Sequence, residues 1–436
     1  MEFTTKRVIG GVVSLVSTIL ALQPALAAPS ITLKASFDPS ISYSAYAALT
    51  PAGNGLFYGT TVGGGMYNAG TVYEFDPSGS GSITTKASFL GASPSAALTR
   101  ARNGLFYGTT LFGGNNNAGS IYEFDPFGNG SITLKASFDG ANGSGPAGEL
   151  LSAGNGLFYG TTVGGGSYGF GTIYEFDPSG GGLITLKGSF DYATGAVPEA
   201  ALTPAGNGLF YGTTSRGGSY GVGTIYEFDP SGGGSITLKA SFDYATGIFP
   251  IESLTPAGNG RFYGSTSDGG YNSDGTIFEF DPSGAGSITL RANFDRTSFS
   301  RPSSTLLPTT NGTFYGTTAL NGINGYGAIF EFDPLGSGGT GPITLKAIFD
   351  GANGYSPIGL TLAGDDLFYG VAVGGGIYDV GAIYKFNSSP SSSVPGPLPL
   401  MGAVSAFSWS RRLRRRILQM RSHVHDRPLK GVSCKK

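Results

Sequence analysis

One string of residues recurs seven times along this chain, and the repetition limits the possible folds more than any other feature. The string has the form LFYGTT, and successive copies start 49 to 54 residues apart. So regular a spacing indicates a repeat architecture in which each unit packs on its neighbours. The copies occupy residues 56–61, 105–110, 157–162, 209–214, 261–266, 313–318 and 367–372.

Each unit contains four short apolar segments separated by turn signals. A segment of the type P-x-x-x-L-T precedes LFYGTT, and segments of the types IYEF and ITLKASF follow it. These segments are rich in β-branched and aromatic residues, which favour strands. Asp-Pro-Ser-Gly between the third and fourth segments has the order of a type I turn, so these two segments form a hairpin. Each unit is therefore predicted to be a four-stranded antiparallel sheet.

The faces of these strands favour a particular repeat architecture. Phe158 and Tyr159 point to opposite faces of the second strand, so both faces are apolar and must be covered by other sheets. Blades packed around an axis supply that environment. In the fourth strand Ile132, Leu134 and Ala136 are predicted to share one face. A Lys or Arg recurs in this strand in every copy, which is typical of an outer edge.

The phase of the repeats predicts a closed ring. The chain begins with a fourth strand at 31–37 and ends with three strands that lack a fourth. Pairing the first strand with the last completes a seventh blade and leaves no orphan edge. We therefore expect an all-β fold, a seven-bladed β-propeller over residues 28–389 with about 51 residues per blade. A parallel β-helix is the alternative, although its coils are shorter and poorer in hairpin turns.

The repeat resembles the GloVer family of Gly-rich tandem repeats. The motif G-x-(L/F)-Y-G-T-T-x-x-G-G, followed by G-(T/A)-(V/I)-(Y/F), fits residues 156–166 and 171–174, and all seven copies match with small changes. The paired glycines also resemble those of kelch repeats. The GloVer resemblance implies a secreted bacterial repeat protein joined to various anchors, and it implies no known enzymatic activity.

The N-terminal end has the layout of a secretory signal peptide. Lys6 and Arg7 precede an apolar run over 8–22, and Ala25 and Ala27 form a small-x-small cleavage site. The run is too short to span a bilayer, which takes about 20 apolar residues. We expect residues 1–27 to be removed and the rest of the chain to be exported.

The C-terminal end has the layout of a sorting signal. A Ser/Pro linker (390–397) leads into an apolar stretch predicted to form a short helix and then an Arg cluster, together 398–416, followed by a basic tail (417–436). This order resembles the PEP-CTERM signal of Gram-negative bacteria, which implies membrane attachment before processing by an exosortase, and a secreted or cell-surface location. A short polybasic surface segment is the alternative. The residues that carry the resemblance are Val394, Pro395, Pro397, Arg411, Arg412, Arg414, Arg415 and Arg416.

Composition excludes most familiar catalytic chemistry. The single Cys434 and the two histidines, His423 and His425, all lie in the last 14 residues. The repeats therefore cannot form a disulfide, a thiol nucleophile, a His base or a Cys/His zinc site. Residues 28–410 carry 26 acidic and 14 basic side chains, which disfavours nucleic acid as a partner. We predict that the chain is not an enzyme and has no cofactor and no metal.

Two sets of carboxylates are nevertheless candidates for a site. Six copies carry Glu-Phe-Asp, which either binds Ca²⁺ or has structural roles, with Asp capping the turn and Glu pairing with a nearby Lys. Glu149, Glu199 and Glu252 break the repeat in the first strands of three consecutive blades. First strands line a propeller axis, so these three either supply the acid and base of a glycosidase or are solvated acids at the channel mouth.

Tyrosines gather in the loops at one end of the blades. Aromatic rings with hydroxyls on a charge-poor face suit sugars, although the same rings can instead pack over Gly-rich loops. We therefore expect a non-enzymatic binding or structural module whose partner is a glycan or another extracellular matrix component. The alternative is a carbohydrate-active enzyme that uses the axial carboxylates. The candidate ligand-binding residues are Tyr67, Tyr168, Tyr220, Tyr271, Tyr326, Tyr378, Tyr192 and Tyr244.

Overall fold

The computed structural model describes residues 30–388, apart from 41, 95, 128–129, 180, 232, 297–299, 321–323 and 337–342. Within this part the chain forms strands and turns and no helix, hence none long and apolar enough to cross a membrane. The predicted signal peptide, linker, apolar and Arg-rich segment and basic tail, with their cleavage and sorting residues, lie outside the described residues.

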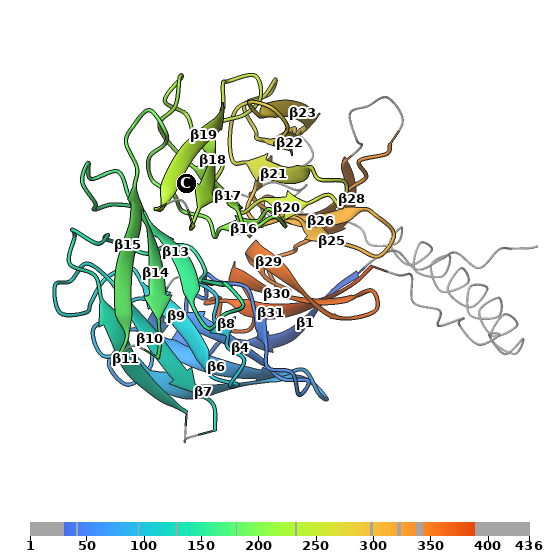
Figure 1. Ribbon diagram of the computed structural model, residues 1–436. Helices are drawn as coiled ribbons and strands as arrows, with labels where there is room; N and C mark the ends of the chain where they lie inside the picture. Colours follow the sequence, from blue (N-terminus) through green and yellow to red (C-terminus); the bar gives the residue numbers. More distant parts are fainter. Residues whose placement is uncertain are drawn as a thin grey trace, which may run out of the picture. The chain divides into compact units, whose positions relative to one another are not determined.

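The strands form seven antiparallel blades, as predicted (Figure 1). Within a blade the strands follow chain order from the axis outward, so the first strand is innermost and the fourth outermost. Blades 1 to 3 comprise β3 (Thr50–Pro51), β4 (Phe57–Thr61), β6 (Thr71–Asp76) and β7 (Ser82–Ser88); β8 (Thr99–Arg100), β9 (Phe106–Thr110), β10 (Ser120–Asp125) and β11 (Ser131–Ser137); and β12 (Leu151–Ser152), β13 (Phe158–Thr162), β14 (Thr172–Asp177) and β15 (Leu183–Ser189).

The next three blades repeat this order with one irregularity. In blade 6 the inner strand is in two pieces, β24 (Ser300–Pro302) and β25 (Leu307–Pro308), which both pair with β26. The other strands of blades 4 to 6 are β16 (Thr203–Pro204), β17 (Phe210–Thr214), β18 (Thr224–Asp229) and β19 (Ser235–Ser241); β20 (Thr255–Pro256), β21 (Phe262–Thr266), β22 (Thr276–Asp281) and β23 (Ser287–Asn293); and β26 (Phe314–Leu320), β27 (Ala328–Phe332) and β28 (Ile343–Ile348).

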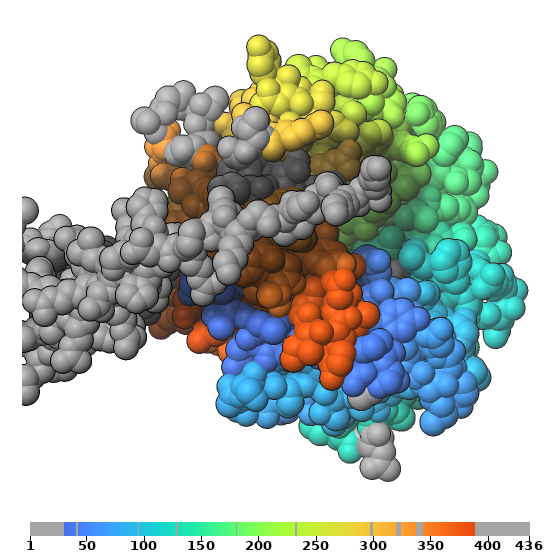
Figure 2. All heavy atoms as spheres, turned by 180° about the vertical axis from the view of Figure 1, so that it is seen from behind, coloured from blue at the N-terminus to red at the C-terminus, as the bar shows by residue number. Residues whose placement is uncertain are grey.

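Blade 7 is built from both ends of the described chain, and this confirms the predicted closure. It combines β29 (Tyr355–Gly364), β30 (Leu367–Gly374) and β31 (Ala382–Asn387) with β1 (Ser30–Ser36). β1 pairs antiparallel with β31, so that Ser30 lies opposite Asn387. Figure 2 accordingly shows N-terminal residues lying against C-terminal ones in the ring. A two-residue pair, β2 (Ser42–Tyr43) with β5 (Gly63–Gly64), lies beside blade 1.

The second strand of each blade packs on both neighbouring blades. Phe158 contacts Tyr107 of blade 2, with ring centroids 5.2 Å apart, and Tyr159 contacts Phe210 and Phe228 of blade 4. All five residues of β13 are buried. The described residues thus form an apolar cluster at each of the seven blade interfaces, and the cluster between blades 7 and 1 closes the ring.

The remaining letters of LFYGTT also have distinct structural roles. A Cβ at Gly160 would lie 2.3 Å from the hydroxyl of Tyr174, so only glycine lets this tyrosine cross the second strand. The Thr161 hydroxyl donates to the carbonyl of Ala200 in the next blade (3.1 Å). The Thr162 hydroxyl bonds that of Thr172 in the same blade (2.8 Å). Both bonds satisfy buried polar groups, which would otherwise destabilise the sheet.

The fourth strand differs from the prediction that one of its faces is continuously apolar. A β-bulge interrupts its pairing with the third strand, and the unpaired residue is the recurring cation, Lys135 in blade 2. Leu134 lies opposite Tyr122, whereas Ala136 lies opposite Ile121, so Leu134 and Ala136 point to opposite faces. A bulge adds a residue without a partner and reverses the alternation that follows it. Every blade has this irregularity.

Candidate functional site

The two ends of the blades differ in what their loops contain. Because neighbouring strands are antiparallel, the loops between strands 2 and 3 and those leading into the next blade share one end, which we call the tyrosine face. The hairpin turns AGNG and DPSG share the other end, the turn face. The tyrosine face carries Tyr67, Tyr168, Tyr220, Tyr271, Tyr326 and Tyr378 between strands 2 and 3, and Tyr192 and Tyr244 between blades.

The loops that present these tyrosines are fixed to the outer strands. In blade 3 the backbone N–H of Ser167 donates to the Ser189 hydroxyl of β15 (3.2 Å), immediately before Tyr168. Gly166 has a φ of +74°, and a Cβ there would lie 2.6 Å from a methyl carbon of Thr172. Ser219 repeats the first contact in blade 4 with Ser241 (3.1 Å). These anchors hold the loop backbone while the tyrosine side chain extends beyond it.

The structure divides the eight candidate tyrosines into two groups. Tyr192 packs against Phe170, with ring centroids 5.4 Å apart, and Tyr326 packs against Tyr355 at 6.0 Å, as expected for rings that cover loops. The other six are exposed by half or more of their area, up to 92% for Tyr271. Exposure of that extent on anchored loops leaves these rings free to meet a ligand. The six are Tyr67, Tyr168, Tyr220, Tyr244, Tyr271 and Tyr378.

Several asparagines beside these tyrosines have structural roles in the loops. The Asn68 side-chain oxygen accepts bonds from the Tyr43 hydroxyl (2.7 Å) and from the N–H of Gly64 (3.2 Å). The Asn272 amide donates to the carbonyl of Phe294 (3.0 Å). These amide groups therefore shape the loops. The tyrosine rings share this face with other exposed apolar side chains, which include Met66, Leu90, Phe112 and Ile377.

At the axis the structure brings together the three glutamates that break the repeat, although each lies just before its inner strand (β12, β16 or β20) rather than within it as predicted. Glu149, Glu199 and Glu252 line one cavity of about 510 Å³. None of the residues lining it carries a positive charge. Seven inner strands converge here, so small side chains are needed, and a Cβ at Gly148 would lie 2.8 Å from the carbonyl oxygen of Ala200. The small residues of the wall include Ala47, Ala48, Ala96, Ala97, Ala201, Ser253 and Ser304.

This environment shifts the pKa of two of the axial carboxyls. Solvent reaches Glu149 inside the cavity, but the surrounding protein removes much of its hydration and raises its pKa to about 7, against a hydrogen bond from Thr99. Burial likewise raises the pKa of Glu252 to about 7, and the charge of Glu199 adds to the rise. The Thr305 hydroxyl donates a hydrogen bond to Glu252 (3.1 Å), and this bond lowers the pKa of Glu252 in opposition to burial.

The repeated glutamates at the outer rim are bound by partners. In blade 3 the Tyr159 hydroxyl donates to Glu175 (2.9 Å), and the ammonium of Lys187 lies 3.6 Å from the same carboxylate oxygen. The bulge therefore directs its cation toward the third strand. These contacts support the structural role of the repeated glutamates, in which each glutamate pairs with a nearby cation. The same trio of Tyr, Glu and cation surrounds Glu74, Glu123, Glu227, Glu279 and Glu331.

Blade 5 buries its rim glutamate most deeply and surrounds it with two arginines. Arg261 and Arg291 lie 2.6 and 2.8 Å from the Glu279 carboxylate, whose side chain is 4% exposed. Burial alone would raise the pKa of Glu279, but the two guanidinium groups and the Tyr263 hydroxyl outweigh it and hold the pKa below its ordinary value. Arginine replaces the usual lysine in the bulge here, and its charge-assisted hydrogen bond of 2.8 Å is shorter than the lysine contacts of 3.5–3.7 Å in blades 1 to 4.

The repeated aspartates serve the turns. Asp177 Oδ1 accepts the N–H of Ser179 (2.8 Å), and Asp229 accepts that of Ser231 at the same distance. Among the described residues no three Asp, Glu, His or Cys side chains form a group that could hold a metal ion. The contacts of these carboxylates thus support turn capping rather than cation binding.

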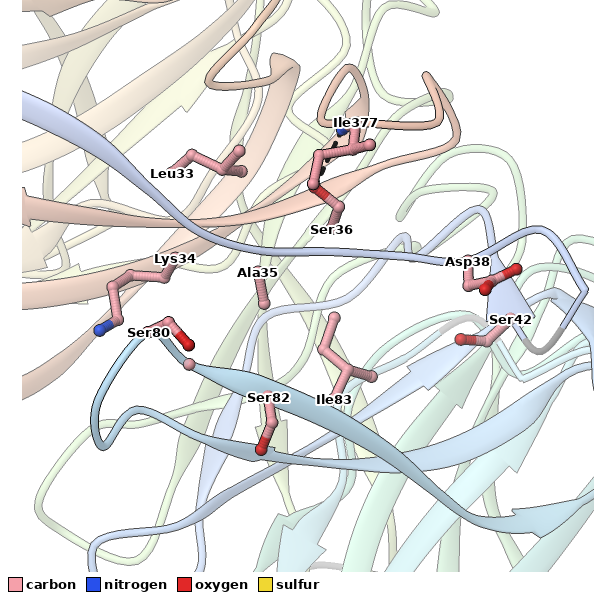
Figure 3. Close-up of a pocket in the computed structure, with 11 residues that line it drawn as sticks. Leu33, Lys34, Ala35, Ser36, Asp38, Ser42, Ser80, Ser82, Ile83 and Ile377 are labelled. Atoms are coloured by element: carbon pink, nitrogen blue, oxygen red, sulfur yellow. Dashed lines mark hydrogen bonds between the residues drawn. The ribbon is translucent and has the colours of Figure 1, made fainter.

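Sequence reasoning did not identify a pocket where the ring closes. A pocket of about 370 Å³ lies between β1 of blade 7 and β7 of blade 1 (Figure 3). Lys34 and Ser80 lie near one end of it, and Asp38 and Ser42 lie near the other. No repeat-breaking residue among its lining marked it in the sequence, because Lys385, which stands in blade 7 where the other six blades have the rim glutamate, does not line this pocket.

Comparison with known proteins identifies the repeat and the fold. A model of the Gloeobacter/Verrucomicrobia repeat matches residues 10–219 and 202–394, whereas no curated protein matches the chain. A fungal alcohol oxidase of the AA5 family is 14% identical, with 86% of this chain and 79% of that chain covered and a TM-score of 0.52. At such identity the likeness concerns the fold alone.

Two further solved structures are similar more loosely. BamB from Moraxella catarrhalis is 14% identical, with 79% of this chain and 85% of that chain covered and a TM-score of 0.45. The β-propeller domain of the Trilobed protease from Pyrococcus furiosus is 10% identical, with 81% and 99% covered and a TM-score of 0.44.

Proposed function

We propose that this chain, which belongs to the Gloeobacter/Verrucomicrobia repeat family, is an exported, non-enzymatic propeller that binds glycans through its tyrosine face. One observation carries the proposal: six tyrosines on that face are exposed by half or more of their area although their loops are anchored. A single exposed aromatic ring would need no explanation, but a set that recurs at one end of the blades points to a binding surface.

The chemistry of this face suits sugars better than other ligands. A tyrosine ring covers the apolar face of a pyranose, and its hydroxyl meets the sugar's own hydroxyls. Tyr168, Tyr220 and Tyr271 occupy the corresponding loops of three consecutive blades, so one extended chain of sugars meets several rings. Binding distributed over repeated weak contacts gains affinity from multivalency.

The two ends of the sequence support an extracellular location. The signal peptide at 1–27 exports the chain, and the C-terminal segment holds it at the membrane until an exosortase-like enzyme cleaves near Pro395–Pro397. Mass spectrometry of the mature surface protein tests this part. Recovery of peptides from beyond Arg416 in the mature chain would contradict processing and would favour a simple anchor.

Glycan binding is tested with a variant of the exposed rings. We expect the full-length chain to bind immobilised bacterial polysaccharides on a glycan array, and the triple variant Tyr168→Ala/Tyr220→Ala/Tyr271→Ala to bind about tenfold or more weakly. The matched control is Phe127→Ala/Leu335→Ala, which removes exposed apolar side chains, 79% and 91% exposed, from the turn face. Equal loss of binding in both variants would contradict the proposal.

The axial cavity supports a second candidate, a glycoside hydrolase. A carboxyl with a pKa near 7 suits a general acid, and paired carboxylates are the usual catalytic groups of such enzymes. Release of reducing ends from a polysaccharide by the full-length chain, lost in Glu149→Gln or Glu252→Gln but retained in Glu175→Gln, would favour this candidate. Glycan binding without any turnover would favour the binding module.

A further inference from the structure

Blade 7 departs from the other six at the outer rim. In six blades a carboxylate on the third strand is held by a tyrosine hydroxyl from the second strand and a cation from the fourth. Blade 7 keeps the same register: Tyr369 pairs with residue 385, which pairs with Thr32, and Lys34 follows at the bulge. Residue 385, however, is lysine. The donors that surround a carboxylate elsewhere are present here without the carboxylate.

These donors have few partners within the described part of the chain. No ion pair joins Lys385 to another described residue, and no hydrogen bond engages the Tyr369 hydroxyl. Lys34 turns instead toward blade 1 and donates to the carbonyl of Gly79 (2.9 Å). Asp76 is the acid whose pKa Lys34 helps to lower, but its carboxylate already accepts the N–H of Ser78 (2.8 Å). Two lysines therefore stand on adjacent strands, β1 and β31, of a body that is otherwise acidic.

The pocket at the ring closure adjoins this cationic spot. Lys34 belongs to both, and the serine hydroxyls of residues 36, 80 and 82 line the space between β1 and β7 (Figure 3). Ser42 is 1% exposed, and its hydroxyl has no hydrogen-bond partner among the described residues. A buried hydroxyl that lines a pocket without a protein partner is costly unless a ligand or water completes it.

We propose that this seam binds the carboxylate of an acidic sugar, a uronate unit within a polysaccharide. The seam is defined by Lys34, Lys385, Tyr369 and the serine-lined pocket. The same donor types bind a carboxylate in six other blades, and the hydroxyls suit a sugar. An extended acidic peptide fits less well, because the bulge at Lys34 interrupts the row of backbone groups with which such a peptide would pair.

The location gives this interaction selectivity. Residues 28–410 carry 26 acidic side chains against 14 basic ones, so the rest of the body repels a polyanion. Attraction is confined to the seam and falls as salt rises. The Lys34 end of this site lies on the rim, whereas Asp38, Ser42 and Ile377 at the other end of the pocket belong to loops of the tyrosine face. The site does not include Tyr168, Tyr220 or Tyr271, so the two proposals can be tested separately.

The test compares charged and neutral sugars on the full-length chain. In calorimetric titrations we expect a galacturonate trisaccharide to bind at least about tenfold more tightly than a galactose trisaccharide. The variant Lys385→Glu restores the residue found in the other blades, so that the new carboxylate accepts the Tyr369 hydroxyl and pairs with Lys34 in place of a ligand. We expect it to lose uronate binding about tenfold or more while its melting temperature is kept or raised. The matched control is Lys187→Gln in blade 3, where binding should be unchanged.

Three results would overturn the proposal. They are uronate affinity that is unchanged in Lys385→Glu, equal affinity for the neutral trisaccharide, and tighter binding of a glutamate-rich peptide than of the uronate. The triple tyrosine variant separates this site from the tyrosine face, because it should keep uronate binding at the seam whether or not the tyrosine face binds glycans.

Discussion

Glutamates occur in two regions of this propeller, and the fold treats them in opposite ways. At the rim six glutamates each face a tyrosine hydroxyl and a cation, as Glu175 faces Tyr159 and Lys187. At the axis Glu149, Glu199 and Glu252 line a cavity with no cation in its wall. The rim lowers the pKa of Glu279, where two arginines outweigh burial, whereas burial at the axis raises the pKa of Glu149 and Glu252.

The difference shows how to interpret a repeat protein. The rim glutamates are repeated because every blade needs the same link between its second, third and fourth strands. The axial glutamates occur once each and leave charge where the fold does not compensate it. A residue that breaks the repeat and weakens the fold is retained for a reason other than stability, which marks it as a functional candidate.

The largest expected effect comes from removing charge at the axis. The triple variant Glu149→Gln/Glu199→Gln/Glu252→Gln keeps side-chain size but cannot ionise. Because the folded pKa values of Glu149 and Glu252 are about 7, above the ordinary 4.5, the folded state binds more protons than the unfolded one between these pH values, and the native chain loses stability as the pH rises through them. Because solvent in the cavity screens both carboxyls, we halve the free energy that the two pKa shifts imply. We therefore expect the variant to be more stable than the native chain by about 3 kcal/mol.

Urea unfolding at several pH values checks this prediction. The variant should exceed the native chain by that amount at pH 8, and the excess should fall toward zero near pH 4.5. The rim variant Glu175→Gln is the control and should show no such gain. A difference in stability that does not change with pH would mean that folding does not raise the pKa of the axial carboxyls.

The next effect has the opposite sign and comes from the most buried rim glutamate. Glu279→Gln removes the carboxylate that pairs with Arg291, while Arg261 keeps its ion pair with Asp281 (3.2 Å), and we expect a loss of about 2 kcal/mol at pH 7. The lowered pKa of Glu279 means that its stabilisation is present above pH 4.5 and is lost as the pH falls below that value. Chemical denaturation at pH 7 and pH 3 measures both. A variant as stable as the native chain at pH 7 would remove the contrast with the axis.

An ordinary rim glutamate should matter less. In Glu175→Gln one Lys187 contact of 3.6 Å weakens at a partly exposed site, so we expect a loss below about 1 kcal/mol. The loss should shrink further in 1 M salt, where the screening length is about 3 Å. Thermal melts at low and high salt provide the measurement. A loss as large as that of Glu279→Gln would show that the burial of the glutamate does not determine how much stability is lost.

The smallest effect tests whether every repeated polar group has a role. The Tyr174 hydroxyl is buried and has no hydrogen-bond partner among the described residues, and Phe278 takes its place in blade 5. We expect Tyr174→Phe to change the free energy of unfolding by less than about 0.5 kcal/mol. Tyr159→Phe, which loses the bond to Glu175, should cost about 1 kcal/mol. Equal losses would show that the Tyr174 hydroxyl does contribute.

Much of the fold could be predicted from local patterns. Seven copies of LFYGTT, the aromatic residues on both faces of Phe158–Tyr159 and the unpaired fourth strand at 31–37 were sufficient for a closed seven-bladed ring. The turns were equally predictable, because an Asp before Pro caps a turn through neighbouring residues. Each of these features depends on side chains that are close in sequence.

The candidate sites required the tertiary structure. The bulge at each recurring cation is invisible in an alternating pattern, and it decides that Lys187 turns toward Glu175. Glu149, Glu199 and Glu252 precede their inner strands by two, four and three residues, yet they share one cavity because seven inner strands converge there. Only the register of the strands shows that Lys385 lies beside Tyr369, at the position of the rim glutamate in the other blades.

The sequence alone therefore determined the number of blades, their strand order and their closure, because the apolar periodicity and turn residues that specify them act over a few residues. The tertiary structure alone decided which charges are compensated and which are not. Compensation depends on groups from different strands and blades meeting within a few ångströms, and electrostatic free energy changes steeply with that distance and with burial.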